Sequence, residues 1–121
     1  MRRISLFIAA ATFAVGGVAQ AHPKLTSATP AANATVAKPA HIDLHFSEKL
    51  IPAFSKADLT MAAMPGMAAM KMASTAVLAA DGLSLVITPK APLPAGRYNV
   101  AWQVVSTDTH KSAGSYAFAV K

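Results

Sequence analysis

Cysteine is absent from the 121-residue sequence. Disulfide bonds and thiolate metal sites are therefore excluded, and stability must come from an apolar core, which a chain of this length can form. A chain without thiols is also compatible with handling a redox-active metal, because such a metal would oxidise a neighbouring thiol. Nitrogen, oxygen and thioether groups are thus the donors available to a metal ion.

Acidic residues are scarce: five aspartates and glutamates stand against eleven lysines and arginines, for a formal net charge of +6. Such an imbalance is one sign of nucleic-acid binding. After the first three residues, however, the basic residues stand singly, and Arg97 is the only arginine among them. Because no basic stripe with interleaved aromatic residues is present, we interpret the charge as a solvated surface and expect no nucleic-acid partner.

The N-terminus has the features of a secretory signal peptide. A pair of arginines precedes the apolar residues 4–18, and the Ala-Gln-Ala sequence that follows matches a cleavage site. The apolar run is short for a membrane span and two glycines interrupt it, which argues against an uncleaved anchor. We therefore predict a signal peptide at residues 1–21, export to the periplasm, and a mature domain at residues 22–121 that begins with His22.

Eight prolines punctuate the sequence, and they divide it into short segments in the manner of an all-β protein. Several segments alternate apolar and polar residues, as strands with one buried face do. We predict seven strands, near residues 25–28, 41–46, 57–61, 74–78, 83–87, 98–104 and 115–120. This number indicates a seven-stranded Greek-key β-sandwich or barrel of the immunoglobulin-like or cupredoxin-like kind.

The alternation also predicts which side chains face the core. In the last three predicted strands the inward positions are Leu85, Ile87, Tyr98, Val100, Trp102, Val104, Tyr116, Phe118 and Val120. Turns are predicted at Asp81-Gly82 and at residues 94–96. The alanine-rich residues 61–80 favour a helix by propensity, but a proline-glycine pair interrupts them, so we expect a loop or an irregular edge there.

His22 is the strongest candidate metal ligand. As the first residue of the mature chain it would offer a free α-amine and the imidazole Nδ1 to one ion, and this compact chelate suits the tetragonal nitrogen and oxygen preference of Cu(II). Copper often recruits a deprotonated backbone amide at an unstructured N-terminus, but Pro23 has no N–H to give. The remaining ligands must therefore come from elsewhere in the fold.

Asp108 and His110 are the best candidates for those ligands. They follow the strand predicted over residues 98–104, and their two-residue spacing lets both side chains project the same way from extended backbone. A carboxylate oxygen and an imidazole would complete a coherent Cu(II) donor set with His22. Taken singly, an aspartate here more often caps a turn and a histidine more often lies on the surface. A terminal histidine that needs partners makes us favour ligation.

Five methionines fall within one short window: Met61, Met64, Met67, Met70 and Met72. Thioethers bind Cu(I) well and Cu(II) poorly. Methionines also fill irregular core gaps or form adaptable docking surfaces, and that interpretation would suffice for one or two of them. Five methionines around a proline-glycine break indicate an exposed loop that binds a soft metal.

His41 and His45 lie on one face of the strand predicted over residues 41–46, with Asp43 between them. They could form a further metal site, but such residues more often belong to a solvated sheet face, so we leave them out of the principal site. Glu48, just past this strand, is a candidate outer carboxylate that would orient a bound histidine through a hydrogen bond.

Several segments resemble the CopC family of periplasmic copper-resistance proteins. They are residues 22–25 (His-Pro-Lys-Leu), 27–30 (Ser-Ala-Thr-Pro), 44–48 (Leu-His-Phe-Ser-Glu) and 94–98 (Pro-Ala-Gly-Arg-Tyr), followed by Trp102, Val105, Ser106, Asp108, His110, Gly114 and Phe118. The resemblance covers essentially the whole mature chain. The combination of segments is more specific than any one of them.

The resemblance implies a seven-stranded Greek-key fold with a Cu(II) site at one end and, in some members, a methionine-rich Cu(I) site at the other. It implies Cu(II) ligands at His22, Asp108 and His110, a nearby carboxylate at Glu48, and a methionine loop at residues 61–72. The Cu(I) loop of the family usually contains a histidine, which this loop lacks. Copper exchange with a membrane copper transporter or another periplasmic copper protein is also implied.

We therefore expect a non-catalytic copper carrier. One alternative is a histidine-brace copper oxygenase, although such enzymes usually need a larger scaffold with a flat substrate face. Another is a metal-free structural or adhesion β-sandwich. No Ser-His-Asp nucleophile, paired-carboxylate pattern or glycine-rich phosphate loop stands out in the sequence, so hydrolysis and phosphoryl transfer are not indicated.

Overall fold

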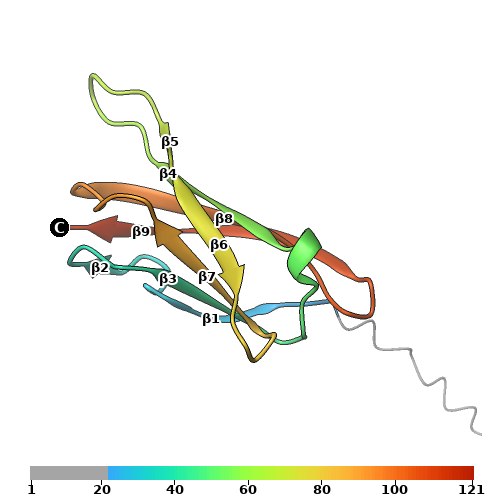
Figure 1. Ribbon diagram of the computed structural model, residues 1–121. Helices are drawn as coiled ribbons and strands as arrows, with labels where there is room; N and C mark the ends of the chain where they lie inside the picture. Colours follow the sequence, from blue (N-terminus) through green and yellow to red (C-terminus); the bar gives the residue numbers. More distant parts are fainter. Residues whose placement is uncertain (1–21) are drawn as a thin grey trace, which may run out of the picture.

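The computed structural model describes residues 22–121, which form two β-sheets packed against each other (Figure 1). The predicted signal peptide, residues 1–21, lies outside the described residues. Among residues 22–121, no helix has the length and apolar character needed to cross a membrane.

The two sheets share the strands almost equally. The four-stranded sheet has the order β1 (Leu25–Thr29), β3 (Ile42–Phe46), β7 (Ser84–Pro89) and β6 (Ser74–Leu78). The five-stranded sheet has the order β2 (Thr35–Val36), β9 (Lys111–Val120), β8 (Gly96–Val105), β4 (Lys56–Met61) and β5 (Met70–Met72). A short 3-10 helix, η1 (Pro52–Phe54), precedes β4. Neighbouring strands are antiparallel except for β2 and β9, which run parallel.

The prediction of an all-β sandwich is confirmed, but the described residues contain nine strands rather than seven. The seven predicted segments correspond to β1, β3, β4, β6, β7, β8 and β9. The two additional strands, β2 and β5, contain two and three residues, which is too few to show an alternating pattern. The alanine-rich residues 61–80 supply β5 and β6 and form no α-helix, as expected.

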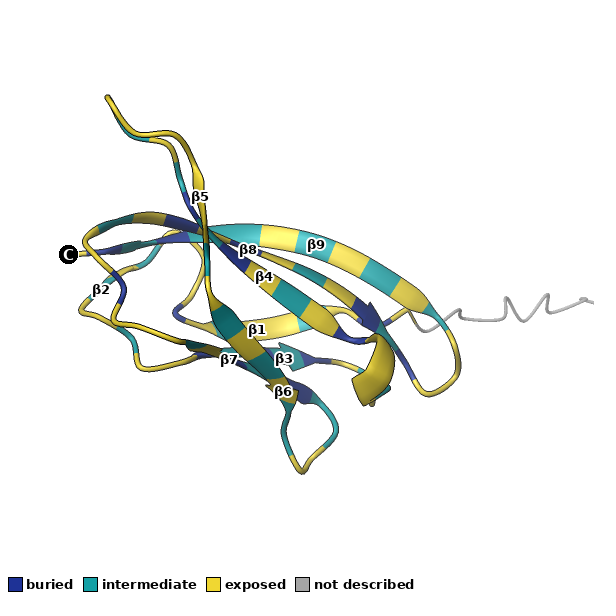
Figure 2. Cartoon of the chain, turned by 45° about the horizontal axis from the view of Figure 1, so that its top comes forward, coloured by how far each residue is buried: buried dark blue, intermediate teal, exposed yellow. Residues whose placement is uncertain are grey.

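The core lies between the sheets and follows the alternation of the sequence, which Figure 2 shows along β8 and β9. The predicted inward residues that are buried are Leu85, Ile87, Tyr98, Val100, Val104, Phe118 and Val120. Trp102 and Tyr116 also face inward but are only partly buried, and they pack against the edge of the core. The indole of Trp102 lies over Gly114, where a Cβ atom would collide with the ring.

Strand β8 connects the two ends of the sandwich that carry the candidate ligands. Near its start, Tyr98 pairs with Met61 of β4. At its end, Val105 pairs with Lys111 of β9, and the connecting turn contains Asp108. At about 3.3 Å per residue, the stretch from Tyr98 to Val105 spans about 23 Å. The methionine segment and the Asp108 turn therefore lie at opposite ends of the sandwich (Figure 1).

Candidate metal centre

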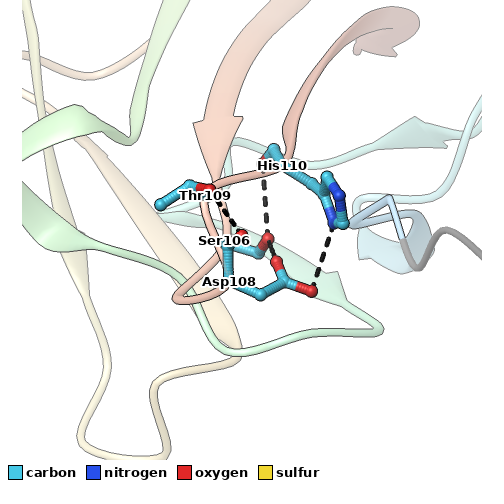
Figure 3. Close-up of polar contacts among 4 residues, drawn as sticks. All are labelled: Ser106, Asp108, Thr109 and His110. Atoms are coloured by element: carbon cyan, nitrogen blue, oxygen red, sulfur yellow. Dashed lines mark hydrogen bonds and ion pairs between the residues drawn. The ribbon is translucent and has the colours of Figure 1, made fainter.

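A tight turn between β8 and β9 carries two of the predicted ligands (Figure 3). The amide of Ser106 donates to the carbonyl of His110 at 2.9 Å, and the amide of Thr109 donates to the carbonyl of Ser106 at 2.8 Å. Thr109 has a φ of 72°, which reverses the chain. The backbone between Asp108 and His110 is therefore a turn, and the prediction of extended backbone between them is wrong.

Asp108 and His110 nevertheless face each other across this turn. Nδ1 of His110 lies 3.2 Å from Oδ2 of Asp108, and Oδ1 of Asp108 accepts a hydrogen bond from Ser106 Oγ. Although 3.2 Å is within hydrogen-bonding distance, the His110 ring and the Asp108 carboxylate are not oriented to form a hydrogen bond. The buried Nδ1 has no hydrogen-bond partner among residues 22–121. A buried nitrogen without a partner beside a carboxylate is suited to binding a metal ion.

The surroundings of Asp108 favour its charged form. The hydrogen bond from Ser106 is the main cause that holds the pKa of this carboxyl below its ordinary value of 3.8. Partial desolvation opposes this effect, whereas the backbone and the imidazole of His110 add to it. Because Ser106 is buried, its hydroxyl is held in place. The turn therefore presents an ionised carboxylate, which is the form that binds a cation.

The N-terminal segment brings His22 to the same turn. The ring centroids of His22 and His110 lie 5.1 Å apart, with 56° between the ring planes. Just after His22, the amide of Lys24 donates to Ser47 Oγ and the amide of Ser47 donates to the Lys24 carbonyl, both at 2.9 Å. These bonds hold the segment just after His22 to the loop that follows β3. The fold thus brings His22 together with Asp108 and His110 across most of the sequence.

The predicted donor set also includes a group that depends on proteolysis. In the full chain the α-nitrogen of His22 is a peptide nitrogen, and cleavage after Ala21 would convert it into a primary amine. Among the described residues, no three His, Asp or Glu side chains are gathered tightly enough to hold an ion as they stand. His110 therefore contacts His22 and Asp108 separately, and the three side chains are not drawn together around one point.

Glu48 lies in the loop between β3 and η1, which borders both segments that carry the candidate ligands. On one side, Ser47 is bonded to Lys24; on the other, the Lys49 carbonyl accepts a hydrogen bond from the Thr107 amide at 2.9 Å. The side chain of Glu48 is partly buried. The backbone thus places Glu48 near the candidate centre, and its contact with a bound histidine stays a prediction.

The methionines are divided between the core and the surface. Met61, on β4, is buried, and Met64 and Met72 pack against the core from partly exposed positions, whereas Met67 and Met70 are 47% and 50% exposed. At the tip of the β4–β5 hairpin, amide–carbonyl bonds of 2.9 and 2.8 Å join Met64 and Met67 reciprocally. The prediction of an exposed loop therefore holds for Met67 and Met70 but not for Met61, because Met61 lies on the inward face of β4 and is part of the core.

His41, just before β3, and His45, on the outer face of β3, have separate partners. Nε2 of His41 lies 3.4 Å from Oδ2 of Asp43. Nδ1 of His45 lies 2.7 Å from Ser84 Oγ, which in turn donates to Oδ2 of Asp81 at 3.0 Å. The two histidines therefore have different neighbours and share no contact partner in these bonds.

The fold and the two clusters define a class: a small β-sandwich with an imidazole and carboxylate cluster at one end and a methionine hairpin at the other. Comparison with known protein families shows to which family of this class the chain belongs. The model of the CopC domain matches residues 25–121, so the chain belongs to the CopC family and the resemblance seen in the sequence is confirmed. The match includes Asp108 and His110, whereas His22 precedes its first residue.

Known relatives and a solved structure support the same assignment. Copper resistance protein C of Xanthomonas campestris pv. juglandis is 53% identical over 103 residues, which cover 84% of this chain and 81% of that protein. Copper resistance protein C of Pseudomonas syringae pv. tomato is 51% identical over 120 residues, which cover 98% and 94%. The crystal structure of PcoC, a methionine-rich copper resistance protein from Escherichia coli, has a TM-score of 0.78 at 48% identity and covers 84% of this chain and 100% of that chain.

Proposed function

We propose that this protein is a periplasmic copper-binding protein of copper resistance and that it holds Cu(II) through His22, Asp108 and His110. The observation that best supports this proposal is the 5.1 Å approach of the His22 and His110 rings, with Asp108 3.2 Å from His110. Membership of the CopC family and relatives named for copper resistance support copper as the metal. Copper is here a cargo that is bound and released.

The donor chemistry agrees with this metal. After cleavage, the α-amine and the imidazole of His22 would form one chelate, and His110 and Asp108 would add a nitrogen and an oxygen. Three nitrogen atoms and one oxygen atom match the tetragonal preference of Cu(II). Glu48, in the loop anchored to Lys24 and Thr107, would orient a bound histidine as an outer carboxylate.

The methionine hairpin supports a second role, the binding of Cu(I). Met67 and Met70 offer exposed thioethers at the tip, and Met64 and Met72 lie beside them at the border of the core. Thioethers suit Cu(I) rather than Cu(II). Met61 would join such a site only if the hairpin moved, because its side chain is buried and its Cε lies against the backbone of Gly96.

A carrier agrees better with this donor set than an enzyme does. Four protein donors would fill the equatorial positions of Cu(II) and leave little room for oxygen to bind and react. We therefore propose a non-catalytic protein that exchanges copper with a membrane copper transporter or another periplasmic copper protein. Residues 1–21 would direct its export as a cleaved signal peptide.

Blocking the α-amine tests the terminal chelate. The mature protein beginning at His22 is compared with the same protein carrying an acetyl group on the His22 α-nitrogen, and the Kd for Cu(II) is measured by competition with a coloured chelator. We expect binding about a hundredfold weaker in the acetylated protein, a loss of roughly 3 kcal/mol, because the amide nitrogen of the acetyl group no longer binds beside the imidazole. The Kd for Cu(I) and the melting temperature of the metal-free protein should not change. Equal Cu(II) binding by both proteins would refute the terminal chelate.

A further inference from the structure

Pro23 is completely buried although it would be the second residue of the mature chain. Its exposed fraction is below 2%, whereas His22 and Lys24 on either side of it are exposed. The first residues of a domain are ordinarily poorly ordered unless packing or hydrogen bonds hold them. The prolyl ring is therefore the buried anchor nearest to His22, and it lies one residue from the candidate metal centre.

Backbone restraints on both sides of this ring limit where His22 can go. The pyrrolidine ring fixes φ of Pro23 near −65° and restricts the residue before it to extended conformations. The paired hydrogen bonds between Lys24 and Ser47 hold the next residue. Few rotatable bonds therefore separate a fixed backbone from the imidazole of His22, whose centroid lies 5.1 Å from that of His110.

Pro23 also lacks the group with which the fold would have to compete for copper. When Cu(II) binds a terminal amine, the next backbone nitrogen can lose its proton and close a five-membered chelate ring. The nitrogen of Pro23 carries no proton and cannot bind in this way. The coordination position beside the amine is therefore available to a side chain, and His110 is the imidazole that the fold brings there.

We propose that Pro23 is a positioning residue that selects the donors of the Cu(II) centre: its buried ring holds His22 beside His110, and its missing N–H reserves a coordination position for the His110 imidazole. This inference rests on the proposed Cu(II) function. It extends that function, because a residue that touches no metal decides whether the copper is held by the fold or by the chain terminus alone.

A double-mutant cycle tests the second part. Cu(II) affinities are measured for the mature protein, Pro23→Val, His110→Ala and the double variant; valine keeps an apolar side chain in the buried site and restores the N–H. With Pro23 present, removal of the imidazole should weaken binding by at least about tenfold. With valine present, we expect a loss below about threefold, since the backbone amide replaces the missing nitrogen. Equal losses in both backgrounds would overturn this part.

Two spectroscopic measurements distinguish donor selection from a merely structural role. Cu(II)-loaded Pro23→Val should absorb visible light at shorter wavelength than the Pro23 protein, because a deprotonated amide is a stronger-field donor than the group it displaces. An unchanged spectrum would count against donor selection. In the metal-free protein, NMR contacts between the His22 and His110 rings should weaken in Pro23→Gly, and their persistence would show that the buried ring is not the anchor.

The outcomes separate this inference from the proposed function. If acetylation of the His22 α-amine leaves Cu(II) binding unchanged, the terminal chelate itself is wrong. If acetylation weakens binding while the cycle shows equal losses, the Cu(II) site stands and the role of Pro23 is wrong. Thermal unfolding of each metal-free variant verifies its fold, and Pro23→Ala, which adds the same N–H, replaces Pro23→Val should the latter fail to fold.

Discussion

The two ends of the sandwich hold their candidate copper ligands in different ways. At the Asp108 end, backbone hydrogen bonds shape the turn, the buried Ser106 hydroxyl donates to the carboxylate, and Pro23 beside His22 is buried. At the methionine end, two thioethers are exposed on a hairpin and Met61 is part of the core. One end presents arranged donors, and the other divides its donors between core and solvent.

The polarity of the donors explains this difference. Burying a carboxylate without a partner is costly, and Asp108 is exposed and accepts a hydrogen bond from Ser106 Oγ. A thioether is apolar and adaptable, so a methionine can fill the core without needing a polar partner. Methionines of one hairpin can therefore serve either the core, as Met61 does, or the surface, as Met67 does, whereas the Asp108 carboxylate needs a hydrogen-bonded turn to hold it.

The largest expected effect separates the two kinds of methionine. Met61→Ala should destabilise the metal-free protein by about 2–5 kcal/mol, because it opens a cavity in the core beside Gly96. Met67→Ala, the matched control on the same hairpin, should change stability by less than about 0.5 kcal/mol. Urea unfolding followed by circular dichroism measures both. Similar losses in the two variants would contradict the division between core and surface.

A smaller effect is expected on metal binding at the other end. Asp108→Asn keeps the shape of the side chain but removes its charge, so Cu(II) affinity should fall by about tenfold to a hundredfold while Cu(I) affinity stays unchanged. Asp58→Asn is the control of equal charge, because Asp58 is exposed and pairs with Lys71 at 3.2 Å on the outer face of β4. If Asp58→Asn weakened Cu(II) binding as much, the effect would be one of net charge alone.

The smallest effect concerns acid sensitivity of the metal-free protein. Because the folded-state pKa of Asp108 is lowered, chiefly by Ser106, the unfolded chain binds more protons than the folded protein between the two pKa values. The contribution of Asp108 to stability is therefore complete above its ordinary value of 3.8 and is lost as the pH falls through the lowered pKa. Ser106→Ala should move this pKa up toward 3.8 in an NMR titration of the carboxyl group. An unmoved pKa would show that the hydroxyl is not its cause.

The long strands were predictable because their evidence is local. Residues such as Leu85 and Val100 alternate with polar neighbours at the two-residue period of a strand, and both are buried in the structure. Strands β2 and β5 were missed because segments this short show no period. The same alternation placed Trp102 and Tyr116 on the inward face, but it could not show that they lie at the edge of the core.

The candidate ligands were predictable as residue types, whereas their geometry was not. The spacing of Asp108 and His110 suggested convergence from extended backbone, but the structure produces it through a turn in which Thr109 has positive φ. Nothing in the sequence shows that Pro23 is buried. The next residue, Lys24, is bonded to Ser47 in the loop after β3, so the placement of this segment depends on contacts between distant parts of the chain.

The all-β class, the inward faces of the long strands and the donor types available can be read from the order of the amino acids, since these follow from side-chain chemistry and from a period repeated along single strands. The tertiary structure alone decided that the His22 ring lies against His110 and that Met61 is in the core while Met67 is exposed. The physical reason is that these facts depend on how loops and sheets pack across long sequence separations, and no local pattern encodes such packing.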